Sequence, residues 1–367
     1  MFATEEGTNL YKEQAISGKN IHPQHFREVF NLHLSSIGLG TYLGQPTEED
    51  DIKVRNAVKT CIKSGAINVI DTAINYRNQR AEREIGNALQ ELISEEAITR
   101  EQIFISTKNG YIAPSEEKYY GKLNEYIFEE LIHRYVCRKE DIVGGIHSMS
   151  PSFLEFQLEQ SLKNLRVSTI DLLYLHNAAE SQLDYVTPSE FYDKLEAAFS
   201  FFERMRDINK IRWYGLATWD SLRVQDKHPH YLQLEKVVDI AKKVGGDNHG
   251  FRFIQVPLNF IYHQAVSLKN QYIENTKYSL AEAAKQFDLY LFTSVPLLQG
   301  QVFKSTVQPK FALLMTKAQQ AIQYSRSAHT RIVSTLVGMK EEEHIKENLK
   351  VATVPPATQE ELESAFS

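Results

Sequence analysis

Cysteine is scarce in this chain of 367 residues, which contains only Cys61 and Cys137. Two thiols cannot form a disulfide framework or a cysteine-rich zinc site, so neither can be the basis of the fold. Long hydrophobic runs are also missing, because no apolar stretch approaches the roughly 20 residues that a membrane-spanning helix needs. Residues 1–14 are polar and acidic and lack the basic start and apolar run of a signal peptide. These absences predict a cytoplasmic protein without a membrane partner.

An excess of basic residues is missing as well. Lys and Arg together number 41 against 47 Asp and Glu, which gives a formal net charge of -6. Nucleic acids attract basic protein surfaces, so we expect no nucleic-acid partner. The hydrophobic share of 42% and the charged share of 24% are ordinary for a globular protein. Intrinsic disorder is therefore excluded as a description of the whole chain.

Eight short apolar runs, rich in β-branched and aromatic residues, are present along the chain. They begin at residues 37, 67, 103, 170, 211, 251, 289 and 332. They are too short to be buried helices, so each one predicts a buried parallel strand. Helical periodicity follows most of them, and the expected helices cover residues 47–65, 153–165, 188–208, 276–287 and 341–351. Thr47 and Asp50 at the start of the first helix have the spacing of a capping box.

The runs recur at intervals of 30 to 43 residues, apart from one interval of 67 residues between the third and the fourth. Eight strand-plus-helix units of this length predict one α/β domain over residues 1–367, a (β/α)₈ TIM barrel. Residues 1–30 form an N-terminal extension. The long interval locates an insertion after strand 3, at 109–150, with a helix-like part at 122–138. This insertion is either a lid over the active site or a helix packed on the flank of the barrel.

A doubly wound dinucleotide-binding fold is the competing interpretation. Residues 38–44 contain three glycines after a predicted strand, and Asp71 ends the next strand, as in a dinucleotide-binding fingerprint. The spacing, however, is G-x-G-x-x-x-G, and Pro46 separates the last glycine from the helix. The eightfold repeat therefore favours the barrel.

Polar side chains stand at the predicted carboxyl ends of these strands, where barrel enzymes build their active sites. Asp71, Lys108 and His176 each end an apolar run, and Tyr76 closely follows the first of them. A lysine paired with an aspartate stabilises a neighbouring phenolate, which predicts a Tyr76 pKa below the usual value of about 10. Such a tyrosine can donate a proton to a carbonyl oxygen that a neutral histidine orients. The four residues predict chemistry on a carbonyl group without a metal.

These residues lie in motifs that resemble those of the aldo-keto reductase family. The resemblance is carried, in the family's order from about residue 34 to 352, by residues 38–41 (GLGT), 71–76 (DTAINY) with Glu82 and Gly86, 105–108 (ISTK), 171–176 (DLLYLH), 255–259 (QVPLN), 296–300 (PLLQG) and 336–348. It implies a (β/α)₈ barrel that binds NADPH, or less often NADH, and reduces aldehydes or ketones.

The resemblance also implies a role for individual residues. Tyr76 is the implied general acid and base, Lys108 and Asp71 tune it, and His176 orients the carbonyl substrate. The implied contacts of the nicotinamide and its ribose are Thr41, Tyr42, Asp71, Asn177, Thr218 and Gln255. Those of the pyrophosphate are Leu297 and Gln299, and those of the adenosine end are Lys340, His344, Glu347 and Asn348. No metal is implied.

The chain departs from the family pattern at two places. Thr218 and Trp219 stand where the family commonly has Ser-Asn, so Trp219 is expected to stack or to shape the pocket. Gly338 and His344 stand where many members have a basic pair for the 2′-phosphate of NADP. Lys340 matches a basic position of other branches, which favours NADPH over NADH.

Two other classes of function are alternatives. A regulatory subunit could bind the cofactor and sense redox state with little turnover, although the complete set of four polar residues argues for an enzyme. A metal-dependent barrel hydrolase could use His147, Asp71 and His176, but the chain has no H-x-H or E-x-x-H spacing near a strand end. The sequence makes no prediction of the oligomeric state.

Overall fold

Eight parallel strands form a closed barrel in the computed structural model, which describes residues 1–366; Ser367, the last residue of the expected domain, lies outside them. In barrel order the strands are β3 (Ile37–Gly40), β4 (Val69–Asp71), β5 (Phe104–Asn109), β8 (Ile170–His176), β9 (Ile211–Ala217), β10 (Phe251–Pro257), β13 (Tyr290–Ser294) and β14 (Ile332–Gly338). Each coincides with one of the eight apolar runs. The predicted (β/α)₈ fold is confirmed.

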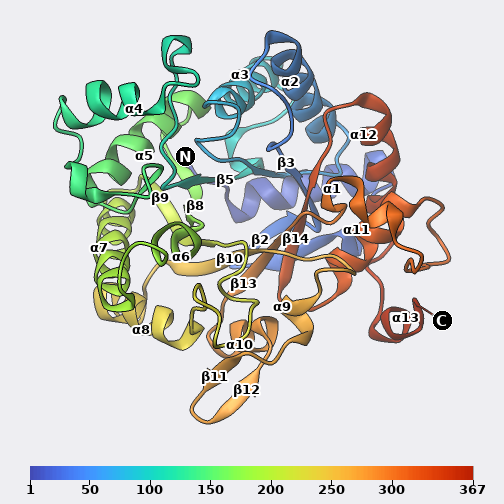
Figure 1. Cartoon of the computed structure of the whole chain (residues 1–367). Coiled ribbons are helices and arrows are strands. Elements are labelled where there is room, and N and C mark those ends of the chain that lie inside the picture. The colour runs from blue at the N-terminus through green and yellow to red at the C-terminus, as the bar shows by residue number, and fades with distance from the viewer. Residues whose placement is uncertain (367) are drawn as a thin grey trace.

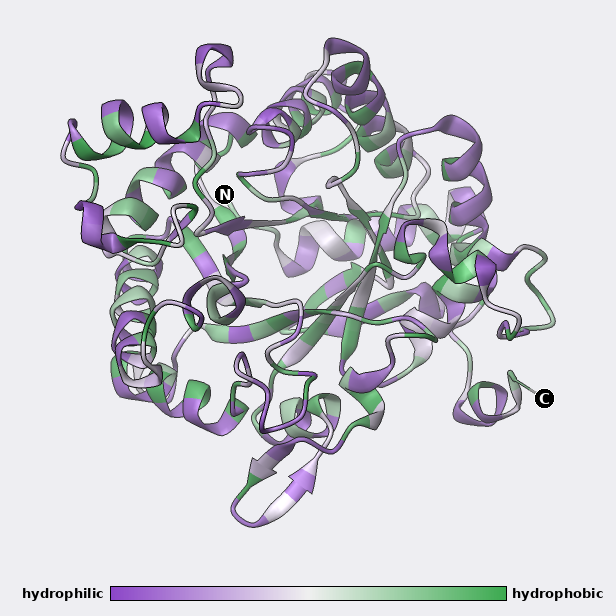
Figure 2. Cartoon of the chain, in the orientation of Figure 1, coloured by the Kyte–Doolittle hydropathy of each residue, from purple (hydrophilic) through white to green (hydrophobic). Residues whose placement is uncertain are grey.

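Helices surround the barrel on its outside, as Figure 1 shows. The larger ones are α2 (Glu48–Lys63), α3 (Arg80–Ser94), α5 (Pro151–Leu165), α7 (Pro188–Asp207), α8 (Leu234–Gly245), α10 (Leu280–Gln286), α11 (Lys317–Ser327) and α12 (Glu342–Leu349). Their ribbons alternate between apolar and polar segments in Figure 2, because each helix buries one face against the strands and exposes the other.

One predicted helix is shorter than expected. Residues 276–287 divide into strand β12 (Thr276–Tyr278), which pairs with β11 (Gln271–Ile273), and helix α10. The boundary is Ser279, whose side chain accepts from the Glu282 amide while the Glu282 carboxylate accepts from the Ser279 amide at 2.7 Å. This capping box starts the helix at Leu280.

The N-terminal extension closes the amino-terminal end of the barrel. It contains α1 (Glu5–Lys19), the 3₁₀ turn η1 (Pro23–His25) and the hairpin β1 (Phe26–Val29) and β2 (Leu32–Ser35). Phe30 and Asn31 both have positive φ at the turn, which is typical of a two-residue hairpin loop. The ring of Phe30 packs on Trp213, at a centroid distance of 5.3 Å, and on other aromatic residues near the starts of the strands. The opposite, carboxyl-terminal end is left for a site.

The insertion after β5 is built from short elements that pack on the flank of the barrel. These are η3 (Glu117–Tyr119), α4 (Leu123–Tyr126), the π-helical η4 (Ile127–Ile132), η5 (Lys139–Asp141) and the two-residue strands β6 (Ile142–Val143) and β7 (His147–Ser148). Helix therefore covers only part of the predicted 122–138. Tyr119, Tyr126 and Leu131 form an apolar cluster with Phe153 of α5.

The remaining elements lie in loops or at the periphery. They are η2 (Arg100–Gln102), α6 (Ala178–Gln182), α9 (Gln264–Ser267), η6 (Leu298–Lys304), η7 (Lys350–Thr353) and α13 (Gln359–Ser364). The β11–β12 hairpin and α13 project from the body of the molecule in Figure 1. Within residues 1–366, no helix combines the length and the apolar character that crossing a bilayer requires.

Gly86 allows α3 to pack closely against the end of α5. A Cβ atom at this position would lie 2.3 Å from the carbonyl oxygen of Asn164. We expect Gly86→Ala to destabilise the fold by about 1–3 kcal/mol, since the backbone of the neighbouring helix must move away. Denaturant unfolding monitored by circular dichroism measures this change. The control is Gly18→Ala at an exposed position of α1, where a Cβ meets nothing within 4 Å and helix propensity predicts slight stabilisation. Equal effects of the two variants would contradict the packing argument.

Candidate active site

A cavity of about 910 Å³ opens at the carboxyl-terminal ends of the barrel strands. Its size lies near the upper end of the range for ligand pockets. Every barrel strand contributes to its wall with a residue at its end or shortly after it, β5 through Tyr111. The lining residues are Gly40, Thr41, Tyr42, Leu43, Asp71, Asn75, Tyr76, Tyr111, His176, Asn177, Ala217, Thr218, Trp219, Gln255, Ser294–Gly300, Phe303, Lys317, Ala318, Leu336, Gly338, His344, Glu347 and Asn348.

An ion pair between Asp71 and Lys108 lies at the floor of this cavity. The Lys108 Nζ atom is 2.6 Å from Asp71 Oδ2 and also donates to the carbonyl oxygen of Thr72 at 2.6 Å. The other carboxylate oxygen, Asp71 Oδ1, accepts from Ser106 Oγ at 2.7 Å and from Gln255 Nε2 at 2.9 Å. Burial disfavours the ammonium, but the Asp71 carboxylate and Tyr76 outweigh it and raise the pKa of Lys108. The ammonium of Lys108 is therefore charged at neutral pH.

Tyr76 lies above this ion pair, in the loop between β4 and α3. The Lys108 ammonium is 4.8 Å from the centroid of its ring. Burial raises the pKa of the Tyr76 phenol, and the ammonium offsets this only in part. The prediction of a lowered Tyr76 pKa is therefore wrong, because burial of the phenol and the nearby Asp71 carboxylate outweigh the effect of the lysine. The phenol keeps its proton at neutral pH.

His176 forms the third side of this polar group. Its ring lies 5.9 Å from the ring of Tyr76 and 5.0 Å from the ring of Tyr111, both edge to face. Burial, with the charges of Lys108 and His147, lowers the pKa of His176 well below its usual value. The imidazole is therefore neutral at physiological pH, as predicted, and can donate one hydrogen bond.

His147 supports His176 from the insertion. Its Nε2 atom lies 2.9 Å from the carbonyl oxygen of His176, and its Nδ1 atom lies 3.0 Å from Gln182 Nε2. A carbonyl only accepts and an amide nitrogen only donates, so His147 carries its proton on Nε2. Both nitrogens are engaged, and Asp71 is bound to Lys108. His147 and Asp71 are thus used in other contacts, and among residues 1–366 no group of three or more His, Cys, Asp or Glu side chains has the arrangement of a metal site.

The predicted cofactor contacts line the cavity with one exception. Eleven of the twelve residues are in its wall, within seven of the strands or after them: Thr41, Tyr42, Asp71, Asn177, Thr218, Gln255, Leu297, Gln299, His344, Glu347 and Asn348. The exception is Lys340, whose ammonium pairs with Asp50. The cofactor-binding roles themselves stay predictions.

Polar atoms in the wall are available for a bound group. Thr218 Oγ1, Asn348 Oδ1 and His176 Nδ1 are buried and have no hydrogen-bond partner among residues 1–366. Unpaired buried polar atoms are uncommon in folded proteins and call for an explanation. Two of them belong to residues expected to hold the cofactor, so the donor set and the size of the cavity fit a nicotinamide dinucleotide.

Several wall residues were not found from the sequence. Asn75, Tyr111, Phe303 and Lys317 line the cavity. Asn75 lies directly before Tyr76 in the motif at residues 71–76, so the motif could have indicated its place at the site. Phe303 lies in a long irregular segment and Lys317 follows it. Periodicity there does not indicate which side chains face the cavity.

Three aromatic residues of the insertion lie away from this wall. Tyr119 and Tyr126 are buried in the apolar cluster of the insertion, and Phe128 is exposed. Only Tyr111 of the segment 109–150 lines the cavity. That this segment closes over the substrate as a lid stays a prediction. The positions of its residues match the alternative, in which the segment packs on the flank of the barrel.

The fold and this site define a (β/α)₈ barrel with a polar, ion-paired cavity at the carboxyl ends of its strands. The model of the aldo/keto reductase family matches residues 36–243, which is more than half of the chain. The chain belongs to the aldo/keto reductase family, and this supports oxidoreductase activity.

Individual relatives are distant. An NADH-specific methylglyoxal reductase of Escherichia coli is 23% identical over 58% of this chain, and the match spans 56% of that protein. The aldo-keto reductase AKR11C1 of Bacillus halodurans, in its holo form, has a TM-score of 0.60 with 17% identity over 93% of this chain and 94% of its own. An aldo/keto reductase of Klebsiella pneumoniae in complex with NADP and acetate has a TM-score of 0.59 with 17% identity over the same shares. At this identity the two structures demonstrate the common fold.

The buried His147 makes the stability of the protein depend on pH. Burial lowers the pKa of this imidazole to about 4, against about 6.5 in an unfolded chain. Below pH 6.5 the unfolded state therefore binds a proton that the folded state does not bind. His147 lowers the free energy of unfolding by about 1.4 kcal/mol per pH unit as the pH falls from 6.5 to 4.

The glutamine in His147→Gln can still donate to the carbonyl oxygen of His176 but does not titrate. We therefore expect the variant to reduce the dependence of the free energy of unfolding on pH by the uptake of nearly one proton. Chemical unfolding between pH 7 and pH 4 gives the slope, and His133→Gln at an exposed position is the control. An unchanged slope in the His147 variant would refute the assignment of a neutral buried imidazole.

Proposed function

We propose that this chain is an NAD(P)-dependent reductase that transfers a hydride to the carbonyl carbon of an aldehyde or ketone, or removes it from the corresponding alcohol. The observation that carries the proposal is Tyr76, which lies over the buried Asp71–Lys108 pair and beside the neutral His176. Membership of the aldo/keto reductase family supports the same reaction class. One similar protein is named NADH-specific and another was crystallised with NADP, which supports a nicotinamide cofactor of either kind.

Tyr76 acts as the general acid in reduction. A nicotinamide cofactor, when bound, supplies the hydride for the carbonyl carbon. Tyr76 is protonated at neutral pH because burial raises its pKa, so it already has the form that a proton donor needs. As negative charge develops on the carbonyl oxygen, the phenol proton moves to that oxygen. In alcohol oxidation the phenolate takes the proton back.

Lys108 stabilises the phenolate that this proton transfer leaves behind. Its ammonium faces the ring of Tyr76, and Asp71 holds it in place through a contact of 2.6 Å. These charges are fixed before the reaction, so no reorganisation is needed when charge develops. The lysine therefore contributes to the transition state more than to substrate binding.

His176 orients the carbonyl oxygen toward Tyr76. Because the imidazole is neutral, it donates a hydrogen bond without competing as a proton source. His147 fixes the backbone at His176 through its hydrogen bond to the carbonyl oxygen. His176 thus orients the substrate, and His147 supports His176.

Aromatic side chains flank the proposed reacting centre. Tyr42 packs edge to face on Tyr76 at 5.1 Å, and Tyr111 packs on His176. Trp219 and Phe303 add further apolar surface to the wall. These walls suit a carbonyl substrate with an apolar or aromatic substituent.

Tyr76→Phe tests the proton donor. The variant should lose about 10²- to 10⁴-fold in kcat for carbonyl reduction, because the phenol acts only as charge develops on the oxygen. Its affinity for the reduced cofactor should stay within a few-fold. Steady-state kinetics with a panel of aldehydes and fluorescence titration of the cofactor measure both quantities.

Tyr119→Phe is the matched control, since that hydroxyl binds Glu129 and Glu130 in the insertion and does not face the cavity. The role assigned to Tyr76 is wrong if its variant keeps near-normal kcat with several carbonyl substrates. A wild-type protein that binds the cofactor but turns over none of the panel would favour the regulatory alternative.

A further inference from the structure

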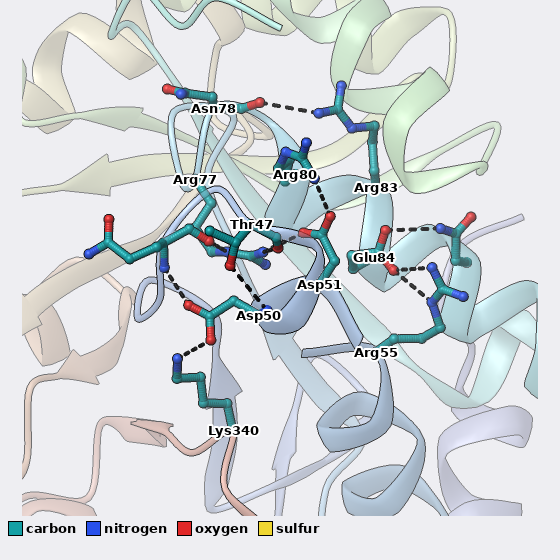
Figure 3. Close-up of polar contacts among 12 residues, drawn as sticks. Thr47, Asp50, Asp51, Arg55, Arg77, Asn78, Arg80, Arg83, Glu84 and Lys340 are labelled. Carbon is teal, nitrogen blue, oxygen red and sulfur yellow. Dashed lines mark hydrogen bonds and ion pairs between the residues drawn. The ribbon is translucent and has the colours of Figure 1, made fainter. Parts of the chain in front are cut away.

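Lys340 is held by a carboxylate of its own chain. It lies in the segment between β14 and α12, and its ammonium pairs with Asp50 in the first turn of α2, as Figure 3 shows. Both side chains are largely withdrawn from solvent, with exposed fractions of 25% for Lys340 and 10% for Asp50. The pair joins two loops that the sequence separates by 290 residues.

Asp50 is available for this contact because it does not complete the predicted capping box. Thr47 accepts from the Asp50 amide at 3.4 Å, as a cap should. The Asp50 carboxylate, however, does not return to Thr47: its Oδ2 accepts from the Gln45 amide at 2.5 Å and its Oδ1 faces Lys340. The backbone before α2 therefore fixes the carboxylate in the direction of the lysine.

The surrounding charges keep Asp50 ionised. Burial raises its pKa, but the hydrogen bonds from Lys340 and from the Gln45 amide lower it more, so that the net pKa of Asp50 lies below its usual value. The nearby Arg77 is committed elsewhere, because it pairs with Asp51 and donates to the carbonyl oxygen of Gln45 at 2.9 Å. The Asp50 carboxylate is thus ionised at neutral pH and faces the ammonium of Lys340.

The pair adjoins the large cavity beside the ends of β3 and β14. Gly40, Thr41 and Leu43 line both the large cavity and a small recess that contains Lys340. Lys317 in the wall of the large cavity is exposed and donates to the carbonyl oxygen of Phe303 at 3.2 Å. Acidic groups are close by, since Glu347 lines the cavity and Glu341 pairs with Lys53.

We propose that Asp50 determines the coenzyme preference by competing with the 2′-phosphate of NADP(H) for the ammonium of Lys340. The inference rests on the proposed function. A 2′-phosphate brings between one and two negative charges, so it must displace Asp50 and leave that carboxylate unpaired beside it. The 2′-hydroxyl of NAD(H) carries no charge and requires no displacement. Asp50 therefore shifts the preference of this chain away from NADP(H), against the expectation from Lys340 alone.

Asp50→Asn tests the proposal with little change of shape. The amide oxygen can still accept from the Gln45 amide, but the charge that holds Lys340 is gone. We expect the ratio of the NADH to the NADPH dissociation constant to rise on the order of five- to tenfold, through tighter binding of NADPH. Fluorescence titration of both coenzymes on the full chain gives the ratio. Glu95→Gln, which removes an exposed carboxylate just after α3 that pairs with Lys59 and Lys63 of α2, is the matched control and should leave the ratio unchanged.

A double-mutant cycle separates competition from a general change of surface charge. In a Lys340→Gln background, Asp50→Asn should change the ratio by less than twofold, because there is no ammonium left to release. Asp50→Ala removes the same charge with another shape and must shift the ratio in the same direction if the asparagine variant folds poorly. A ratio that stays within twofold or falls in the variants with Lys340 intact overturns the proposal. Failure of the wild type to bind either coenzyme would instead refute the proposed function.

Discussion

The buried ion pair of Asp71 and Lys108 is the constraint on which the site depends. Two charges at the floor of an apolar barrel are costly to desolvate and persist only if every polar atom around them is satisfied. Ser106, Gln255 and the carbonyl of Thr72 do so, and they tie β4, β5 and β10 together at the level of the cavity. Removing one partner would leave an uncompensated charge, at a cost of about 3–5 kcal/mol. The same ion pair therefore determines both the stability of this end of the barrel and the electrostatics of the site.

The groups around this pair are kept neutral by the same burial. Tyr76 retains its proton and His176 is a neutral imidazole, so a donor and an orienting group lie beside the pair without adding charge. The backbone beside them is strained: Asn177 after β8 and Val295 after β13 have φ values of 44° and 50°. Positive φ is unfavourable for a β-branched residue such as valine, and such strain is common where loops are shaped for function.

The sequence predicted the barrel well because eight apolar runs at regular intervals leave few alternatives, and because helix and strand periodicities are local properties. It also predicted that Asp71, Tyr76, Lys108 and His176 would meet, since parallel strands end at the same side of a barrel. It could not predict what depends on three-dimensional packing. The pKa of Tyr76 is raised because burial outweighs the effect of the Lys108 ammonium, which is already paired with Asp71. The Asp50–Lys340 contact joins two loops far apart in sequence, and the insertion's aromatic residues could equally have faced the cavity or α5.

The central claim is that hydride passes directly between a nicotinamide cofactor and a carbonyl carbon in this cavity. Incubation with reduced cofactor deuterated at C4, in ordinary water with an aromatic aldehyde, tests it, and NMR of the product alcohol gives the isotope at each position. Using each C4 stereoisomer in turn, the account predicts one deuterium on the carbinol carbon from one isomer and none from the other. Turnover that places no deuterium on that carbon from either isomer would contradict it.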